Sequence, residues 1–355
     1  MQALVGIHVG LEQATTLVAD PDGRIVSLAR AAIPTHRPEP GKVEQEPDDW
    51  WRAVASTCRQ ALKDADVSDF AGVGLASQPN CVVAVDSRGH PLGRALIATD
   101  RRAAAVAADL LTRFEPLDVQ RRTGSRISAT QATIKMAWAS RHWDLFQRCR
   151  QALSAGGFVG QRLTGRSFLD RTQASVSGFL DVHSRQYAVD HLQALGVPAG
   201  KLPSLVDPFE KVGRITSAAA ADTGLRAGLW LAGGLSEPAA CALAAGLAEP
   251  GQALVLPGGE LLVCSAHPVA DAQARTYTCL HTLPQRWLVV ADGEAPIAEQ
   301  LDWLTAAGAP ARELALFGKD ALDEAELADC ARRGLGLQVL DIEAPEALGA
   351  ALAAG

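Results

Sequence analysis

The sequence predicts a two-domain α/β protein, and three features of the chain support this fold class. The chain has 355 residues, a length that suits about two domains. It opens with a strand, a glycine turn and a second strand, within residues 5–16. Hydrophobic residues make up 48% and charged residues 21% of the chain. This balance is ordinary for a globular protein with a buried core.

The N-terminal segment is predicted to form three consecutive strands. Residues 4–9 give an apolar strand, Gly10 gives a tight turn, and residues 15–19 give the return strand. A DPDG turn follows and leads into a third strand at residues 25–28. We therefore expect an antiparallel hairpin with one added strand.

The following segment is predicted to form a helix and then two short strands. Prolines and a glycine make the first half of residues 34–54 irregular. Glu46, Pro47 and Asp48 then open a helix, with its acidic residues at the N-terminus, that runs to about Asp64. Strands follow at residues 70–76 and 82–85, with an SQPN turn between them. Alanine favours helix, so further helices are expected at the alanine-rich residues 103–108, 218–221 and 347–354.

Net charge and cysteine content limit the kinds of binding partner and the cellular compartment that we expect for this protein. The formal net charge is −7 and no basic stripe is present, so a nucleic-acid partner is not expected. The seven cysteines are scattered without a CxxC pair, which favours reduced thiols over a disulfide framework or a zinc site. No apolar run reaches the length of a membrane span, and no signal peptide precedes the first strand. The expected location is therefore the cytoplasm, with no membrane association.

One segment carries a specific family signal. Residues 38–51, PEPGKVEQEPDDWW, resemble a motif of the FGGY family of carbohydrate kinases, the group that contains xylulokinase and glycerol kinase. The chain is most similar to xylulokinase-like members. The resemblance implies a two-domain actin-like or ribonuclease H-like sugar-kinase fold. Further blocks that resemble the family lie at residues 74–103, 162–187, 211–228 and 230–255.

The resemblance also implies a domain division. A polar turn near residues 224–229 suggests an N-terminal, sugar-binding domain at 1–226 and a C-terminal, nucleotide-side domain at 227–355. In the family a long segment separates the parts that resemble residues 287–303 and 314–354. Only about ten residues intervene here, so the second domain is expected to be shortened.

The activity implied by the resemblance is ATP-dependent phosphorylation of a ketose or polyol such as xylulose, with Mg²⁺ as cofactor. The first hairpin of the family has an Asp-x-Gly-Thr-Thr pattern that holds phosphate and positions the metal. This chain has His8, Gly10 and Glu12 in that stretch, and only the glycine is retained. Histidine is a poor ligand for Mg²⁺, and the charge of Glu12 would repel phosphate. Either a protonated His8 pairs with phosphate while Glu12 takes the metal, or the strand serves the fold alone.

The position that resembles the catalytic aspartate of the family is Glu237, in AGGLSEPAACALAAG. Glutamate is a competent general base if its geometry allows. An ordinary helix start explains the same residues equally well, because Ser236, Glu237 and Pro238 suit the first helical turn. Gly233 and Gly234 are expected to form the strand-to-helix turn before it.

The second phosphate hairpin resembles residues 255–263, VLPGGELLV. Gly258 and Gly259 keep the turn, whereas the hydroxyl residues of the family are replaced by Pro257 and Glu260. The adenine-side glycine turn is reduced to Gly318. The nucleotide motifs are therefore weak, and the sequence assigns no metal site.

The sugar side is altered as well. The substrate turn of the family corresponds to residues 76–81, in which Gln78 and Asn80 could still hydrogen-bond a hydroxyl. Asp100 and Arg102 match a second sugar-binding element, or they form a structural ion pair at a helix start.

Two functions therefore remain open from the sequence. One is a carbohydrate kinase with impaired catalysis that binds ATP, Mg²⁺ and a small sugar or polyol. The other is a non-catalytic sugar-sensing or partner-binding relative, a pseudokinase. Shortening of the second domain would expose apolar surface, which a homodimer would cover.

Overall fold

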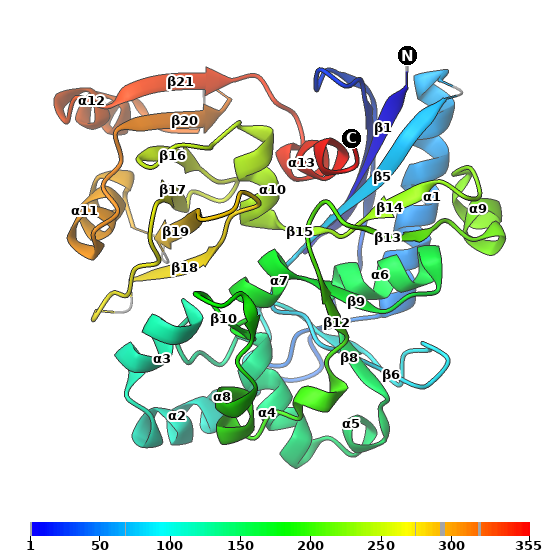
Figure 1. Ribbon diagram of the computed structural model, residues 1–355, viewed down its shortest axis with the longest axis horizontal. Coiled ribbons are helices and arrows are strands. Elements are labelled where there is room, and N and C mark those ends of the chain that lie inside the picture. The colour runs from blue at the N-terminus through cyan, green and yellow to red at the C-terminus, as the bar shows by residue number, and fades with distance from the viewer. Residues whose placement is uncertain (1, 68, 274, 292–294, 319–320) are drawn as a thin grey trace.

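The computed structural model describes residues 2–67, 69–273, 275–291, 295–318 and 321–355, and it forms two lobes around two separate sheets (Figure 1). The first sheet has the strand order β13-β14-β5-β1-β2-β3, with β15 pairing β5. These strands are β1 (Ala3–Val9), β2 (Gln13–Ala19), β3 (Ile25–Ala32), β5 (Phe70–Ser77), β13 (Lys211–Arg214), β14 (Trp230–Ala232) and β15 (Leu235–Ser236). The helices of this layer are α1 (Pro47–Ala65), α6 (Ala155–Thr164) and α9 (Ser217–Thr223).

The predicted N-terminal hairpin is confirmed. β1 pairs antiparallel with β2, and β2 pairs antiparallel with β3. The helix expected from residues 46–48 is α1, with Glu46 as its N-cap, and it ends close to the predicted Asp64. Every residue of β1 is buried, because α1 covers one side of this sheet and a helix from the end of the chain covers the other.

The second sheet has the order β18-β19-β17-β16-β20-β21. Its strands are β16 (Gln252–Val255), β17 (Leu261–Ser265), β18 (Thr276–Leu280), β19 (Trp287–Ala291), β20 (Glu313–Phe317) and β21 (Gly336–Leu340). The accompanying helices are α10 (Glu237–Ala244), α11 (Ile297–Ala307), α12 (Glu324–Arg332) and α13 (Pro345–Ala353). α10 and α13 lie side by side between the two sheets (Figure 1).

The C-terminal helix α13 returns to the first lobe. Ideal Cβ atoms built on Gly6 and Gly74 would lie 1.9 Å and 1.6 Å from the carbonyl oxygens of Ala347 and Ala350, so only glycine permits this approach. The first sheet also extends past the boundary predicted at residues 226/227, because β14 and β15 pair with β5. In chain order, β15 is the last strand of the first sheet and β16 is the first strand of the second. The C-terminal helix α13 packs on the first sheet.

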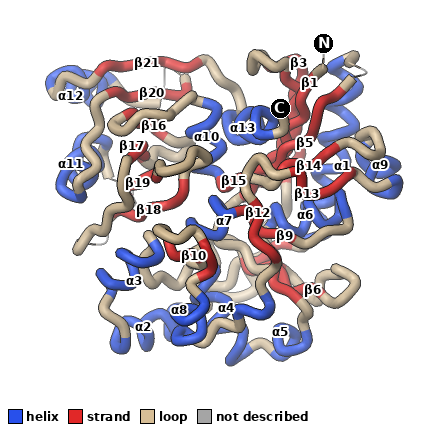
Figure 2. The backbone as a smooth tube through the Cα atoms, viewed as in Figure 1, coloured by secondary structure: helices blue, strands red, loops and turns tan. Residues whose placement is uncertain are grey.

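The lower part of the first lobe is mostly helical (Figure 2). Its helices are α2 (Ala104–Arg113), α3 (Pro116–Thr123), α4 (Ala132–His142), α5 (Asp144–Arg148), α7 (Arg171–Val176) and α8 (Val189–Leu195). Short strand pairs connect them: β4 (Glu44–Gln45) with β7 (Ala95–Leu96), β6 (Val83–Val85) with β8 (Gln151–Leu153), β9 (Phe168–Asp170) with β12 (Ser204–Val206), and β10 (Leu180–Asp181) with β11 (Gln186–Tyr187).

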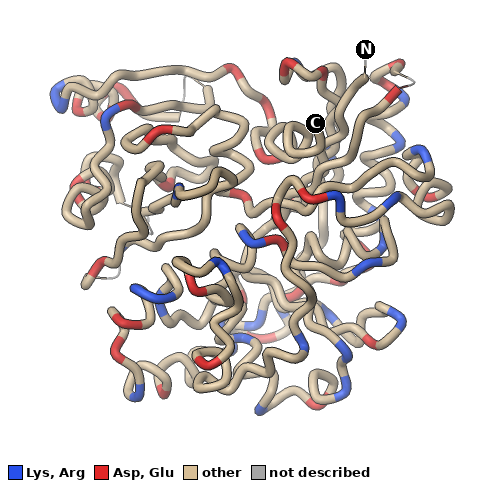
Figure 3. Tube along the Cα trace, viewed as in Figure 1, with Lys and Arg blue, Asp and Glu red and all other residues tan. Residues whose placement is uncertain are grey.

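Basic and acidic residues are interspersed over both lobes (Figure 3). In the described part of the chain, no helix combines the length and the apolar character that crossing a membrane requires.

Candidate functional site

A histidine and a glutamate from distant parts of the chain meet at the carboxyl edge of the first sheet. His8 lies near the end of β1, and Glu237 is the first residue of α10, directly after β15. β1 and β15 both run parallel to β5, so their carboxyl ends come together beside Ala76. Nε2 of His8 lies 2.8 Å from Oε1 of Glu237. The edge where parallel strands end is the usual place for a ligand site in α/β sheets.

The environment of His8 favours an ion pair. Burial alone would lower the pKa of His8, but the hydrogen bond to Glu237 and the charges of Glu237 and Glu346 outweigh burial. The pKa of His8 is therefore raised above its ordinary value. The Glu237 side chain keeps 30% exposure and the His8 side chain 11%. Solvent therefore reaches the Glu237 side chain more than the His8 side chain.

The hairpin turn after β1 keeps its shape through buried glutamines. Nε2 of Gln78 donates to the carbonyl of Gly10 at 3.1 Å, and Nε2 of Gln45 donates to the carbonyl of Leu11 at 2.6 Å. Trp50 Nε1 donates to Oε1 of Gln45 at 2.7 Å, which explains the spacing of glutamine and tryptophan in the 38–51 motif. Gln78, predicted to touch substrate, is 1% exposed and lies under this turn.

Gly10 is required here for close packing. A Cβ atom at Gly10 would lie 2.9 Å from Cε1 of His8. The imidazole ring therefore lies against the turn. Glu12 lies elsewhere, on a separate groove beside Arg37 and Thr99.

The turn that carries Glu237 is held by two residues that the sequence analysis did not single out. The backbone N–H of Ser236 donates to Oγ1 of Thr172 at 2.8 Å, and that hydroxyl donates to Oδ1 of Asp170 at 2.6 Å. Burial raises the pKa of Asp170 to about 6. Gly234 has φ +101°, and a Cβ on Gly233 would lie 2.0 Å from the carbonyl oxygen of Asp207, so both predicted turn glycines are required. The sequence feature that could have identified Asp170 and Thr172 is their D-x-T spacing at the start of α7.

A cleft of about 370 Å³ lies between the lobes, and two residues named in the sequence analysis, Asn80 and Glu260, line it. Asn80 lines it from the first lobe, while Glu260 and Tyr277 line it from the second. Burial raises the pKa of Glu260, and the charge of Glu237 adds to this effect. Gly258 and Gly259, with φ +110° and +90°, form the preceding turn and have open space around them. Gly318 also has positive φ, and its backbone N–H donates to the carbonyl of Leu340 at the end of β21.

Asn80 is held in a left-handed conformation with φ +59°. Its Oδ1 accepts a hydrogen bond from the backbone N–H of Ala132 at 3.1 Å. Nζ of the buried Lys135 donates to the carbonyls of Asn80, Ile97 and Ala98 at 3.0, 2.6 and 3.3 Å. Burial lowers the pKa of Lys135 to about 8. This lysine ties the turn at Asn80 to the 97–98 segment.

Asp100 and Arg102 form a structural ion pair. Asp100 is fully buried and accepts from the backbone N–H of Val43 at 2.7 Å. Arg102 donates to both carboxylate oxygens of Asp100 and reaches Glu44 at 2.6 Å. Of the two roles open from the sequence, this geometry favours the structural one.

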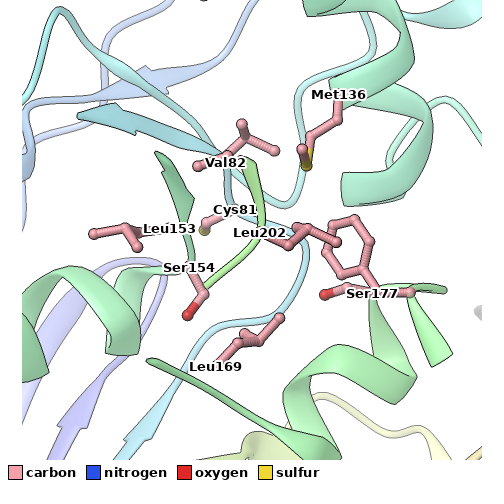
Figure 4. A pocket seen from close by; sticks show the side chains of 10 residues that line it. Cys81, Val82, Met136, Leu153, Ser154, Leu169, Ser177 and Leu202 are labelled. Carbon is pink, nitrogen blue, oxygen red and sulfur yellow. The ribbon is translucent and has the colours of Figure 1, made fainter. Parts of the chain in front are cut away.

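A small cavity lies beside Cys81 and Val82, directly after Asn80 in the chain (Figure 4). Its volume is about 10 Å³, and mostly apolar side chains from Cys81, Val82, Met136 and Leu202 line it. This space admits at most one water molecule. Burial raises the pKa of the Cys81 thiol to about 12, so the thiol stays protonated and unreactive.

The residues at the hairpin do not fit a bound Mg²⁺. The cation prefers several oxygen ligands in octahedral geometry, whereas an imidazole paired with a single carboxylate occupies this place. Among the described residues, no group of three or more His, Cys, Asp or Glu side chains is arranged to hold a metal ion.

The two sheets with a cleft between them, and a carboxylate where the central strands end, define a two-lobed α/β protein with a candidate ligand site between its lobes. The pattern of the FGGY family of carbohydrate kinases, N-terminal domain, matches residues 3–244. The chain belongs to this family.

Relatives agree with this assignment. The chain is 33% identical to glycerol kinase from Methylobacterium nodulans over 218 residues, which is 58% of this chain and 43% of the relative. It is 25% identical to xylulose kinase from Escherichia coli over 302 residues, or 84% of this chain and 62% of the relative. The matched region thus spans 43% to 62% of the length of these relatives.

Solved structures show the same fold. The crystal structure of xylulose kinase from Rhodospirillum rubrum superposes with a TM-score of 0.89 at 22% identity, covering 99% of this chain and 89% of that one. Gluconate kinase from Lactobacillus acidophilus gives a TM-score of 0.86 at 15% identity, covering 99% and 88%. The predicted actin-like, ribonuclease H-like fold is therefore confirmed.

Proposed function

We propose that this protein binds a small sugar or polyol in the cleft between its lobes, and that phosphoryl transfer from ATP is strongly impaired or lost. The observation that carries the proposal is the 2.8 Å contact between Nε2 of His8 and Oε1 of Glu237. A general base must offer a free carboxylate oxygen to the proton that it removes. The imidazole engages Oε1 of Glu237, which leaves only Oε2 outside this contact to accept a proton.

The charge of His8 supports the same conclusion. In the family, the corresponding aspartate helps to position Mg²⁺, and the metal neutralises charge that develops during phosphoryl transfer. A cationic imidazole at this place repels the metal. The relatives are named for glycerol, xylulose and gluconate, which supports a small polyhydroxylated ligand for the cleft.

Calorimetric titration and an ADP-release assay test the proposal. Purified protein would be titrated with Mg-ATP and separately with glycerol and D-xylulose, and ADP would be measured with each acceptor. We expect binding of an acceptor without acceptor-dependent ADP release. The double substitution His8→Asp with Glu237→Asp, which installs the family residues, is expected to raise ADP release above that of the wild type.

The alternative is an active kinase in which Glu237 is the general base. Its supporting observation is the 30% exposure of the Glu237 side chain near the cleft. Acceptor-dependent ADP release by the wild-type protein that disappears in Glu237→Gln would establish this alternative and overturn the proposed loss of catalysis.

A further inference from the structure

The last strand of the second sheet leaves one of its edges open. β21 lies at the outer rim of the second lobe, and among the described strands it pairs only with β20 (Figure 1). Its sequence, GLQVL, contains no charged residue and no proline, and the residues before Leu340 are all exposed. Proteins usually protect an open edge with charges, proline or a covering segment, because the edge can pair with another strand. β21 has none of these protections.

The backbone of β21 determines which groups the open edge presents. The N–H of Gly336 and the carbonyl of Leu340 form hydrogen bonds on the β20 side, at 3.4 and 3.0 Å. Alternate residues of a strand direct their N–H and C=O groups to opposite sides. The N–H and C=O groups of Leu337 and Val339 therefore point away from β20, towards the open edge.

The same two residues also expose apolar side chains. The exposed fraction is 41% for Leu337 and 49% for Val339. Their register partners in β20 are Leu314 and Leu316, which are buried in the core that α11 and α12 cover. Residues paired in a parallel ladder share one face of the sheet. Leu337 and Val339 thus continue a buried apolar row to the rim of the lobe, where it meets solvent.

We propose that β21 pairs antiparallel with β21 of a second copy of this chain, which joins the two second sheets across a twofold axis. The register that we infer is centred on Gln338. It brings Leu337 opposite Val339 of the second copy, so the outward N–H and C=O groups of both residues are used in each chain. It also places leucine against valine on one sheet face. This inference does not depend on the proposed function.

The charges at the two ends of β21 favour an antiparallel arrangement and a second copy as the partner. Arg332 and Arg333 precede the strand, and Asp341 and Glu343 follow it. The Arg332 side chain is 68% exposed and the Glu343 side chain 65%, although each has one ion-pair partner in its own chain. Antiparallel pairing places the basic start of one strand beside the acidic end of the other. Parallel pairing would instead place like charges together.

Sedimentation velocity of the full chain over a range of concentrations tests the dimer. Two short strands bury a small area, so we expect a monomer–dimer equilibrium with a Kd on the order of micromolar. Val339→Pro removes an outward N–H and leaves the hydrogen bonds to β20 in place, so it should weaken the dimer about tenfold or more. Val339→Thr keeps both the N–H and the branched side chain. It is the matched control and should dimerise like the wild type.

A cysteine substitution tests the register. In the inferred pairing, Gln338 lies opposite Gln338 of the second copy in a non-hydrogen-bonded pair, with a Cα separation of about 4.5 Å, which suits a disulfide. Gln338→Cys should therefore form a disulfide-linked dimer under mild oxidation. The seven native cysteines are buried, so their contribution should be small. Gln193→Cys, at an exposed position on α8, is the control for random collision and should crosslink far less.

Three outcomes would overturn the inference. The first is a protein that stays monomeric throughout the micromolar range and does not crosslink through Gln338→Cys. The second is a dimer that persists in a folded Val339→Pro variant, because the copies then meet at another surface. The third is an assembly that keeps growing with concentration, because a twofold pairing closes at two copies. If Val339→Pro fails to unfold cooperatively, the crosslinking of Gln338→Cys against Gln193→Cys decides.

Discussion

At the scale of single residues, the His8–Glu237 pair makes stability depend on pH. The pKa of His8 is raised in the folded protein because the hydrogen bond and charge of Glu237 outweigh burial. A raised histidine pKa contributes stability that is fully present below the unfolded pKa of about 6.5. That contribution is lost as pH rises through the folded pKa.

We therefore expect His8→Asn to cost more stability at pH 6.0 than at pH 8.5. The difference should be about 2 kcal/mol, the order of a hydrogen bond to a charged group. Urea denaturation of both proteins at the two pH values measures it. His142→Asn, at an exposed histidine, is the control and should show no such difference. An equal loss from His8→Asn at both pH values would contradict an ionised pair.

The residue scale also shows what the sequence could and could not predict. The predicted turn glycines Gly10, Gly233 and Gly234 follow from local pattern, and each is required by packing or by a positive φ. The partner of Glu237 could not be predicted, because His8 is 229 positions away in the chain. The contacts of Lys135 could not be predicted either, because only the fold brings together the three carbonyls that it binds.

At the scale of elements, two glycines decide where α13 packs. The sequence predicted the helix from its alanines, but nothing local indicates that it covers the first sheet. The decisive contacts join Gly6 and Gly74 to the α13 backbone, across most of the chain. Alanine and glycine on facing elements allow their backbones to approach closely. The packing of α13 on the first sheet depends on such a pairing of small residues, and sequence spacing alone does not reveal which small residues face each other.

Gly74→Ala should therefore destabilise the protein strongly. The new Cβ would lie 1.6 Å from the carbonyl oxygen of Ala350, a backbone atom that cannot rotate away. Overpacking of this kind costs up to about 3 kcal/mol, and thermal or urea unfolding measures it. Gly200→Ala is the matched control, because a Cβ there meets nothing within 4 Å. A Gly74→Ala variant as stable as that control would contradict the described packing.

At the scale of the whole molecule, the two lobes depend on each other for folding. The family pattern ends at residue 244, yet the first sheet needs α13, which lies at residues 345–353. α13 buries Leu348 and Ala351 against Leu4 and Leu17, so a fragment without it would expose an apolar sheet face. Exposed faces of this kind lead to association or to loss of fixed packing.

A fragment of residues 1–244 should accordingly fail to form a native first lobe. We expect near-ultraviolet circular dichroism to be largely lost and a dye that binds exposed apolar surface to fluoresce strongly. Co-expression with a fragment of residues 245–355 should restore the native spectrum, because it supplies α13 in trans. The matched comparison is the same C-terminal fragment ending at residue 344, which should not restore it. A cooperatively unfolding 1–244 fragment would show that the first lobe is an independent folding unit and that α13 only docks onto it.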